Sequence, residues 1–424
     1  MDLPIDRPFT LADVSVPACL VEGFAVGPAD HEGVVRLDVG IGEGRLREPA
    51  GERIACGGRM LWPAPIDVHT HLDKGHIWPR ARNADGSFDS ALETVRQDRE
   101  THWHAADVAA RMDFGLRSAF AHGTCAIRTH LDSSGAQAAI SWPVFAETRA
   151  RWAGRIDLQG VSIAVLDDYA GAKGPYLADL VAEHGGLLGL VPWLTDDLAA
   201  ELDRFLELAG DRGLDVDLHV DESLDPAAMT LRELALAVRR TGFAGRVVAG
   251  HCCSLAVQEE ADALRTLDLV AEAGIAVVSL PLCNLYLQDR AGARTPRRRG
   301  VTLLHEMRTR GIAVMVASDN TRDPFYAYGD LDLHEVFRLA VRIGHLDHPF
   351  GDWPRTVTAT PARIMGLDER GVIRPGAPAD LVLFEGRSFS EVLSRPESRR
   401  TILRGGRISA AEPPAYRELD ALFT

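Results

Sequence analysis

Two histidines at 69 and 71 end an apolar, β-prone run, within the stretch PIDVHTHLDK at residues 65–74. In an extended chain, side chains at i and i+2 point to the same side of the backbone. His69 and His71 can therefore share one metal ion. Taken alone, such a pair fits a metal site and an ordinary strand end equally well, so other ligands must decide between them.

Three further residues with metal-binding side chains, His219, His251 and Asp319, also follow apolar runs. Imidazole nitrogens together with one carboxylate suit a divalent ion such as Zn²⁺ or Fe²⁺ and leave a coordination position for water. Buried structural histidines are the alternative, but chance would rarely place four histidines and an aspartate at equivalent strand ends. The sequence therefore predicts a metal site that lowers the pKa of a bound water to about 7.

Glu222 lies three residues after His219, in the stretch HVDE. A lone glutamate in a loop is by default an exposed carboxylate. Beside a metal-binding histidine it is close enough to carry protons to and from a substrate in the same cavity. We therefore predict that Glu222 is the general acid and base.

The elements that must position these residues are short apolar runs alternating with amphipathic stretches. The runs fall at 66–69, 124–129, 158–165, 187–192, 214–219, 246–250, 275–280 and 312–317, and examples of the helical patterns are 106–121, 196–210, 229–240 and 256–273. This alternation predicts an α/β fold, a closed parallel (β/α)8 barrel of the TIM type. The C-terminal ends of its strands share one rim, where the predicted ligands would meet.

Shorter β-like segments flank this region, at 34–39 and 57–61 before it and at 371–384 and 401–408 after it, with a helix expected around 354–365. We predict three parts. Residues 1–62 and 367–424 would form a small β-sandwich built from both termini, the latter with a C-terminal tail, and residues 63–366 the metal-dependent barrel.

The net charge of −15 argues against nucleic acid and anionic membranes as partners, because both require clustered cations. The one basic cluster, Arg297–Arg299, is interpreted as a solvated loop. Six scattered cysteines without CxxC spacing, an N-terminus lacking signal-peptide features and the absence of a long apolar run favour a cytoplasmic protein. Apolar residues at 350–353 suit a subunit contact, so a homo-oligomer is a further expectation.

Several motifs together resemble the amidohydrolase superfamily, in particular its cytosine deaminase branch. They are DVHTHLDK at 67–74, RTHLD at 128–132, HVDE at 219–222, GH at 250–251, LPLCNLYLQ at 280–288, SDN at 318–320 with DP at 323–324, and GAPADLV at 376–382. The first and sixth motifs are equally similar to N-isopropylammelide amidohydrolases.

The resemblance implies one divalent ion, Zn²⁺ or Fe²⁺, held by His69, His71, His219 and Asp319, with His251 contacting the metal-bound hydroxide. The expected fourth strand carries no lysine of the kind that bridges two metals in binuclear relatives. Hydroxide would attack the ring carbon that bears an exocyclic amine. Glu222 would pass a proton to the adjacent ring nitrogen, and Asp319 would help to protonate the departing ammonia.

The implied function is a deaminase of a small amino-substituted N-heterocycle, a hydrolase of C–N bonds other than peptide bonds. The alternative is hydrolysis of another C–N bond, in an N-alkyl amino-triazine or a cyclic amide. The expected substrate contacts are Gln288 after the seventh strand, Asn320 and Phe325 after the eighth, and Leu72 and Lys74 after the first.

Two departures from cytosine deaminases point to a substrate other than cytosine. The third strand ends at Val165, where those enzymes have a glutamine that contacts the pyrimidine edge. Asn320 replaces the aspartate that usually follows the metal-binding aspartate. Losing a buried amide contact removes discrimination for a polar ring edge.

Overall fold

The computed structural model describes residues 3–4, 7–395 and 399–423 of the chain. The fold is mixed α/β, as predicted. The chain forms two compact units, one of residues 1–67, 117–126 and 332–413, the other of residues 68–116, 127–331 and 414–424. The three-part division at 62/63 and 366/367 stays a prediction.

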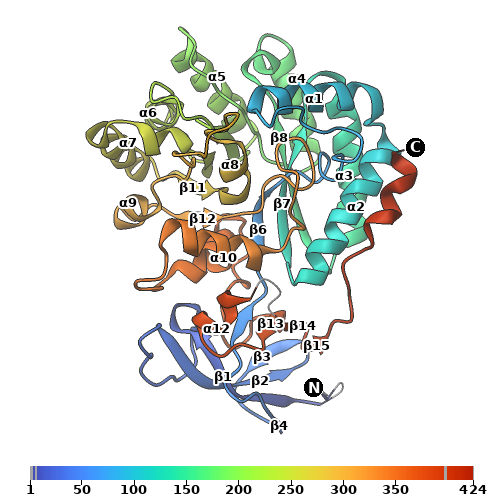
Figure 1. The fold of residues 1–424 in the computed structure, drawn as a ribbon, viewed down its shortest axis with the longest axis vertical. Coiled ribbons are helices and arrows are strands. Elements are labelled where there is room, and N and C mark those ends of the chain that lie inside the picture. The colour runs from blue at the N-terminus through green and yellow to red at the C-terminus, as the bar shows by residue number, and fades with distance from the viewer. Residues whose placement is uncertain (1–2, 5–6, 396–398, 424) are drawn as a thin grey trace. The chain divides into compact units, whose positions relative to one another are not determined.

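The first unit contains two four-stranded sheets, ordered β3-β2-β1-β4 and β15-β14-β13-β5. Their strands are β1 (Phe9–Pro17), β2 (Val34–Gly42), β3 (Arg45–Arg47), β4 (Glu52–Ala55), β5 (Leu61–Pro63), β13 (Leu381–Phe384), β14 (Arg400–Arg404) and β15 (Arg407–Ile408). Antiparallel pairing of Leu61 with Leu383 brings N-terminal and C-terminal segments into one sheet, visible as blue and red strands in Figure 1. That the two sheets form one sandwich stays a prediction.

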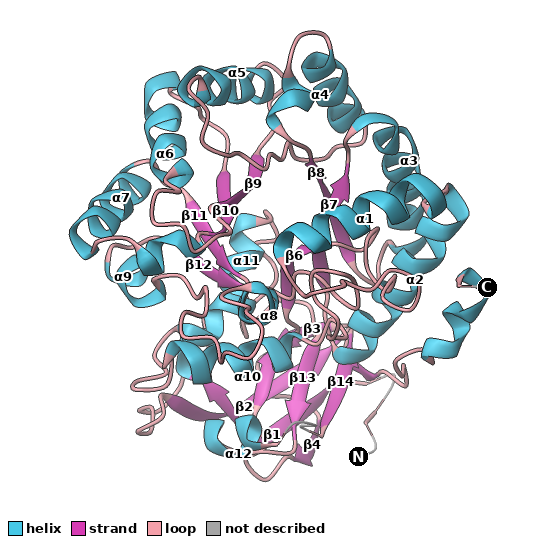
Figure 2. Cartoon of the chain, turned by 45° about the horizontal axis from the view of Figure 1, so that its top comes forward, coloured by secondary structure: helices cyan, strands magenta, loops and turns pink. Residues whose placement is uncertain are grey.

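The second unit is organised around a ring of strands, seen nearly end-on in Figure 2. The strands are β6 (Ile66–Thr70), β7 (Ala126–Asp132), β8 (Asp157–Ile163), β9 (Val216–Val220), β10 (Val247–His251), β11 (Ala276–Ser279) and β12 (Val314–Val316). They form the sheets β6-β7-β8 and β12-β11-β10-β9. Parallel bridges through residues 187–191 join β8 to β9, and the bridge Thr70–Asp319 joins the other two edges.

Helices follow the strands of the second unit, and most of them lie outside the ring in Figure 2. Their bounds are α1 (Phe88–His102), α2 (Ala105–His122), α3 (Ala138–Trp152), α4 (Lys173–Glu183), α5 (Leu198–Gly210), α6 (Thr230–Thr241), α7 (Glu260–Glu272), α8 (Pro281–Leu287) and α9 (Leu304–Thr309). The first unit contains α10 (Leu333–Gly344), α11 (Ala359–Ile364) and α12 (Phe389–Ser394). The four helices given as examples from the sequence correspond to α2, α5, α6 and α7.

Three elements differ from the expectations. The run at 187–192 forms only isolated bridges; Gly189 lies so close to the neighbouring strand that a Cβ would meet the Ser162 carbonyl oxygen at 1.9 Å. The helix expected at 354–365 is divided into a 3₁₀ turn (Trp353–Val357) and α11, because Thr358 between them has φ −136° and ψ −90°. Helix α1 was not predicted, since its outward-facing residues are strongly polar.

The apolar segment at 350–353 packs inside the first unit. Trp353 is 2% exposed, and the Phe350 ring stacks on Phe389 with centroids 4.0 Å apart. A homo-oligomer stays a prediction, but these two side chains are largely buried within the chain. Within the described ranges, no helix is both long and apolar enough to cross a membrane.

Candidate active site

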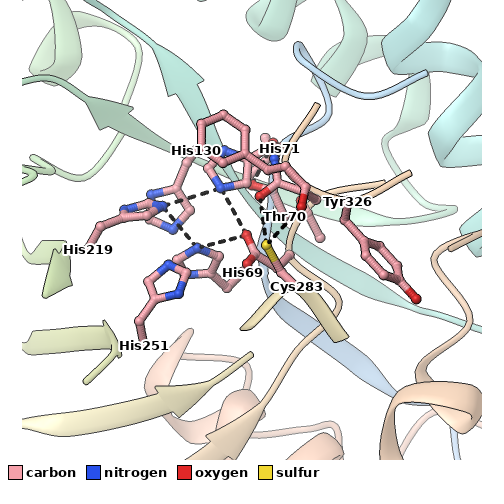
Figure 3. Close-up of polar contacts among 12 residues, drawn as sticks. His69, Thr70, His71, His130, His219, His251, Cys283 and Tyr326 are labelled. Carbon is pink, nitrogen blue, oxygen red and sulfur yellow. Dashed lines mark hydrogen bonds and ion pairs between the residues drawn. The ribbon is translucent and has the colours of Figure 1, made fainter. Parts of the chain in front are cut away.

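Four ligand atoms converge where the ring of strands closes. His219 Nε2 lies 3.2 Å from His69 Nε2 and 3.3 Å from His71 Nε2, and Asp319 Oδ1 lies 3.7 Å and 3.1 Å from the same two nitrogens. Tetrahedral ligands bound at about 2.0–2.2 Å are separated by roughly 3.3–3.6 Å. The separations of 3.1–3.7 Å are close to that range, and His69, His71 and Asp319 form a group able to hold a metal ion, with His219 beside it. Figure 3 shows the three imidazoles pointing toward one another.

Burial keeps these histidines neutral. Removal from water lowers the pKa of His69, His71 and His219 well below 6.5, and neighbouring cationic groups lower it further. Metal ligands must be deprotonated, so the burial that disfavours imidazolium also prepares these side chains for an ion. Asp319, 1% exposed, supplies the single carboxylate of the group.

The strand ends that carry the site have an unusual backbone. Asp221, His251, Cys252 and Asp319 all have φ between 48° and 69°, the left-handed region that non-glycine residues rarely adopt. Gly250 precedes His251 because a Cβ there would lie 3.0 Å from the His69 ring. These turns lie at the ends of β9 and β10 and shortly after β12.

Asp221 fixes the turn that carries Glu222. Its carboxylate accepts hydrogen bonds from Thr230 N at 3.0 Å, Thr230 Oγ1 at 2.6 Å and Leu231 N at 3.0 Å, all at the start of α6. Its carbonyl accepts a further bond from Cys253 N at 3.0 Å. The turn is thus bonded on both sides, and the Glu222 backbone has little freedom to move.

Asn284, on α8, joins Glu222 to His251. Its Nδ2 donates to Glu222 Oε1 at 3.0 Å and lies 3.1 Å from His251 Nδ1. If that nitrogen accepts the second amide hydrogen, the His251 proton must be on Nε2, which is buried without a hydrogen-bond partner among the described residues. The opposite amide orientation would place a carbonyl oxygen against the Glu222 carboxylate. Asn284 therefore sets the tautomer of His251 and holds the proton carrier.

Burial raises the pKa of Glu222 well above 4.5, the charge of Asp319 raises it further, and the Lys74 ammonium opposes the shift. Burial lowers the pKa of His251 to about 3. The Glu222 carboxyl group, with its raised pKa, is suited to proton transfer. The His251 imidazole stays neutral and is suited to donating a hydrogen bond.

We expect Asn284→Ala and Asn284→Asp each to lower kcat by about 10- to 100-fold, the size of one hydrogen bond to a charged group. Aspartate has the size of asparagine, but its carboxylate cannot donate hydrogen bonds to Glu222 Oε1 and His251 Nδ1. It should therefore not restore activity. Steady-state kinetics check this. Near-normal kcat in Asn284→Asp would mean that the residue only fills space.

Glu222, His251 and three of the five predicted substrate contacts line a cavity of about 890 Å³. Lys74, Asn320, Phe325 and Val165 line it, together with α1 residues and Trp193 near its opening. Two predicted contacts, Leu72 and Gln288, are not among the described residues that line this cavity. Gln288 Nε2 instead donates to the Glu222 carbonyl at 3.3 Å, one helical turn beyond Asn284 on α8.

His130 on β7 is part of the site but was given no role from the sequence. Its ring centroid lies 4.0 Å from that of His69 and 4.6 Å from that of His219, and ligand atoms of these three histidines lie within 4.8 Å of one another. Asp217 Oδ1 is 3.8 Å from His130 Nε2, and Arg128 Nη1 binds the other oxygen of that carboxylate at 2.8 Å. The i, i+2 spacing of Arg128 and His130 on an apolar strand was the available signal.

Comparison with known proteins identifies the family of the chain. Residues 115–410 match the Amidohydrolase family, and the chain belongs to that family. It is 52% identical over its whole length to pterin deaminase of Rhizobium rhizogenes, covering 98% of that protein. It is also 24% identical to N-isopropylammelide isopropyl amidohydrolase of a Pseudomonas species, over 86% of this chain and 90% of the relative.

Solved structures share the fold. 5-Methylcytosine deaminase from Klebsiella pneumoniae superposes with a TM-score of 0.80 over 95% of this chain and 98% of that one, at 23% identity. N-isopropylammelide isopropylaminohydrolase from Burkholderia multivorans gives a TM-score of 0.70, at 25% identity, over 94% and 98%. The family resemblance seen in the sequence is confirmed, and the protein is a hydrolase acting on C–N bonds. Metal dependence is general in this family, and the histidine and aspartate group described above is able to bind an ion.

Proposed function

We propose that the protein is a metal-dependent deaminase that replaces the exocyclic amine of a small N-heterocycle by oxygen, and that its substrate is a pterin. The observation that carries the proposal is the convergence of the metal-binding group, Glu222 and His251 on one cavity. The full-length similarity to a pterin deaminase supports the choice of ring. The ring of strands is, on this proposal, a (β/α)8 barrel with its chemistry at the C-terminal strand ends.

His69, His71, His219 and Asp319 would hold one divalent ion, Zn²⁺ or Fe²⁺. Such an ion makes a coordinated water acidic enough to supply the nucleophile at neutral pH. Interatomic separations of 3.1–3.7 Å support a single ion at this position. His251 remains outside this group, with its Nδ1 facing Asn284.

The protein's own groups then move protons. Glu222 accepts one proton as the oxygen of water adds to the amine-bearing carbon, and gives it to the adjacent ring nitrogen. His251, protonated on Nε2, donates a hydrogen bond to the oxygen of the tetrahedral intermediate. When the C–N bond breaks, Asp319 assists the transfer of a proton to the departing nitrogen. The products are ammonia and a ring that carries oxygen in place of the amine.

The cavity also supports a ring larger than cytosine. Its volume of about 890 Å³ exceeds what a single six-membered ring needs, and pockets of about 300–1,000 Å³ hold drug-sized ligands. Val165 lines this space with an apolar side chain. Asn320, the second departure from the cytosine deaminase pattern, donates to Asp323 Oδ2 at 2.7 Å within the cavity wall.

The test is ammonia release by metal-reconstituted protein from pterin, cytosine, 5-methylcytosine and N-isopropylammelide, with isopropylamine measured for the last compound. We expect the highest kcat/KM for pterin. Amine release from N-isopropylammelide alone would favour the alternative C–N bond. A metal-loaded protein that releases ammonia from none of these rings would contradict the proposal.

A further inference from the structure

We infer that Lys74 recognises a ring oxygen of the substrate and makes the enzyme selective for 4-oxo over 4-amino heterocycles. This inference rests on the proposed function, since it places the ring in the cavity beside Glu222. The chain contains 46 basic residues, of which only Lys74 and Lys173 are lysines. Lys173 begins α4 and is exposed, whereas Lys74 lines the cavity and is 6% exposed.

The Lys74 ammonium has no polar partner among the residues that the structure describes. Its Nζ lies 4.9 Å from the centroid of the Phe325 ring, and among the described residues it forms no hydrogen bond or ion pair. An ammonium has three donors and no acceptor. A molecule that fills the cavity removes this ammonium from solvent, and its binding is favoured if it offers an acceptor at this point.

The neighbouring carboxylates are already engaged. Asp323 accepts from Asn320 Nδ2 at 2.7 Å and from the backbone nitrogens of Phe325 and Tyr326 at 2.8 and 3.1 Å. Glu222 is bonded to Asn284, and Asp319 belongs to the metal-binding group. These acids stabilise the cation at longer range and leave its donors free for the substrate.

The position of Lys74 matches a specific part of the ring. Lys74 lies three residues after His71, on the turn closed by the bond from its backbone nitrogen to the His71 carbonyl at 3.2 Å. The carbon that bears the amine must face the metal-binding group and Glu222. In a 2-amino-4-oxo ring, one ring nitrogen lies between the amine-bearing carbon and the carbon that bears the oxygen. The oxygen therefore points away from the amine. A 4-oxo oxygen can accept a hydrogen bond from the Lys74 ammonium, whereas a 4-amino group faces that ammonium with N–H donors.

The first test compares pterin with 2,4-diaminopteridine as substrates of the metal-loaded enzyme and of Lys74→Met. We expect the variant to lose about 10- to 100-fold in kcat/KM for pterin, the size of one charged hydrogen bond, and little or nothing for the diamino compound. Lys173→Met is the matched control and should change neither value. An equal loss for both substrates would mean that Lys74 only supports the structure, and the inference would be wrong.

The second test does not depend on turnover or on the folding of a Lys74 variant. Metal-loaded Glu222→Gln is treated with an amine-acylating reagent, and modification of Lys74 and Lys173 is followed by mass spectrometry. Pterin should slow acylation of Lys74 at least about tenfold and leave Lys173 unchanged, while 2,4-diaminopteridine should protect Lys74 less. Equal protection by both compounds, or by neither, would overturn the inference.

The two proposals can fail separately. If the native enzyme releases ammonia from neither pteridine, the proposed function fails, and the acylation experiment alone decides the role of Lys74. If pterin is deaminated but the ratio of the two kcat/KM values is the same in Lys74→Met as in the native enzyme, the proposed function stands and the inference fails.

Discussion

Glu222→Gln is expected to lower kcat by about 10³- to 10⁴-fold with little change in KM. Glutamine has the same shape and can keep the contact with Asn284, but its amide cannot take up and release a proton. General acid and base catalysis contributes about 10²- to 10⁴-fold, and the upper part of this range applies because one carboxyl group serves both transfers. Ammonia release under substrate saturation measures the effect.

Burial makes the Glu222 carboxyl group different from that of an exposed glutamate. Its side chain is 13% exposed, with Oε1 3.3 Å from His251 Nδ1. Burial and the charge of Asp319 raise its pKa well above 4.5, so this carboxyl group binds a proton more readily than an exposed glutamate does. Glu207→Gln, on the exposed face of α5, is the matched control and should retain full activity. A Glu222→Gln enzyme within tenfold of the native kcat would exclude this residue as the proton carrier.

The second large effect is expected from Asp319→Asn, which should lower the affinity for the metal by at least about 100-fold. Even the partners that only orient a ligand contribute about 10- to 100-fold to metal affinity, and Asp319 supplies the single carboxylate of the group. An amide oxygen is a much weaker ligand for Zn²⁺ or Fe²⁺. Metal content measured after dialysis against a weak chelator should fall from about one ion per chain to less than a tenth, and activity should fall with it.

The stability of the protein gives an independent measurement. Because the ion binds the folded chain, free metal at about 100 times Kd adds about 2.7 kcal/mol to the free energy of unfolding. Asp319→Asn should lose most of this gain, whereas the metal-free forms of the native and variant proteins should differ less. His348→Ala, whose side chain is 94% exposed, controls for metal bound to surface histidines. A variant that keeps one ion per chain after dialysis would contradict the ligand role of Asp319.

The predicted metal ligands could be found from local sequence patterns, because each of them lies at or shortly after the end of one strand. His69, His71, His219 and Asp319 each end an apolar run, and a run of that length determines both a strand and the position of its end. Once the alternation of strands and helices indicates a parallel arrangement, the ends must lie on the same side. The metal-binding group follows from these two steps without knowledge of any contact.

Other features depend on contacts between distant parts of the chain. Asn284 meets Glu222 across 62 residues and His251 across 33, and no spacing in the sequence indicates such a meeting. The same holds for His130, which the ring of strands brings against His69, and for Gln288, which faces the Glu222 backbone. The polar helix α1 escaped prediction because its buried face carries only two apolar residues, Ala91 and Val95.

The sequence by itself therefore determined the family and predicted the metal-binding residues and the proton carrier, because strand ends and short motifs carry that information locally. The tertiary structure decided which groups surround the predicted proton carrier, how large the cavity is, and that Lys74 lines it without a polar partner among the described residues. These properties arise where segments from different strands meet in a buried space, since burial and the satisfaction of hydrogen bonds depend on all the groups that surround an atom.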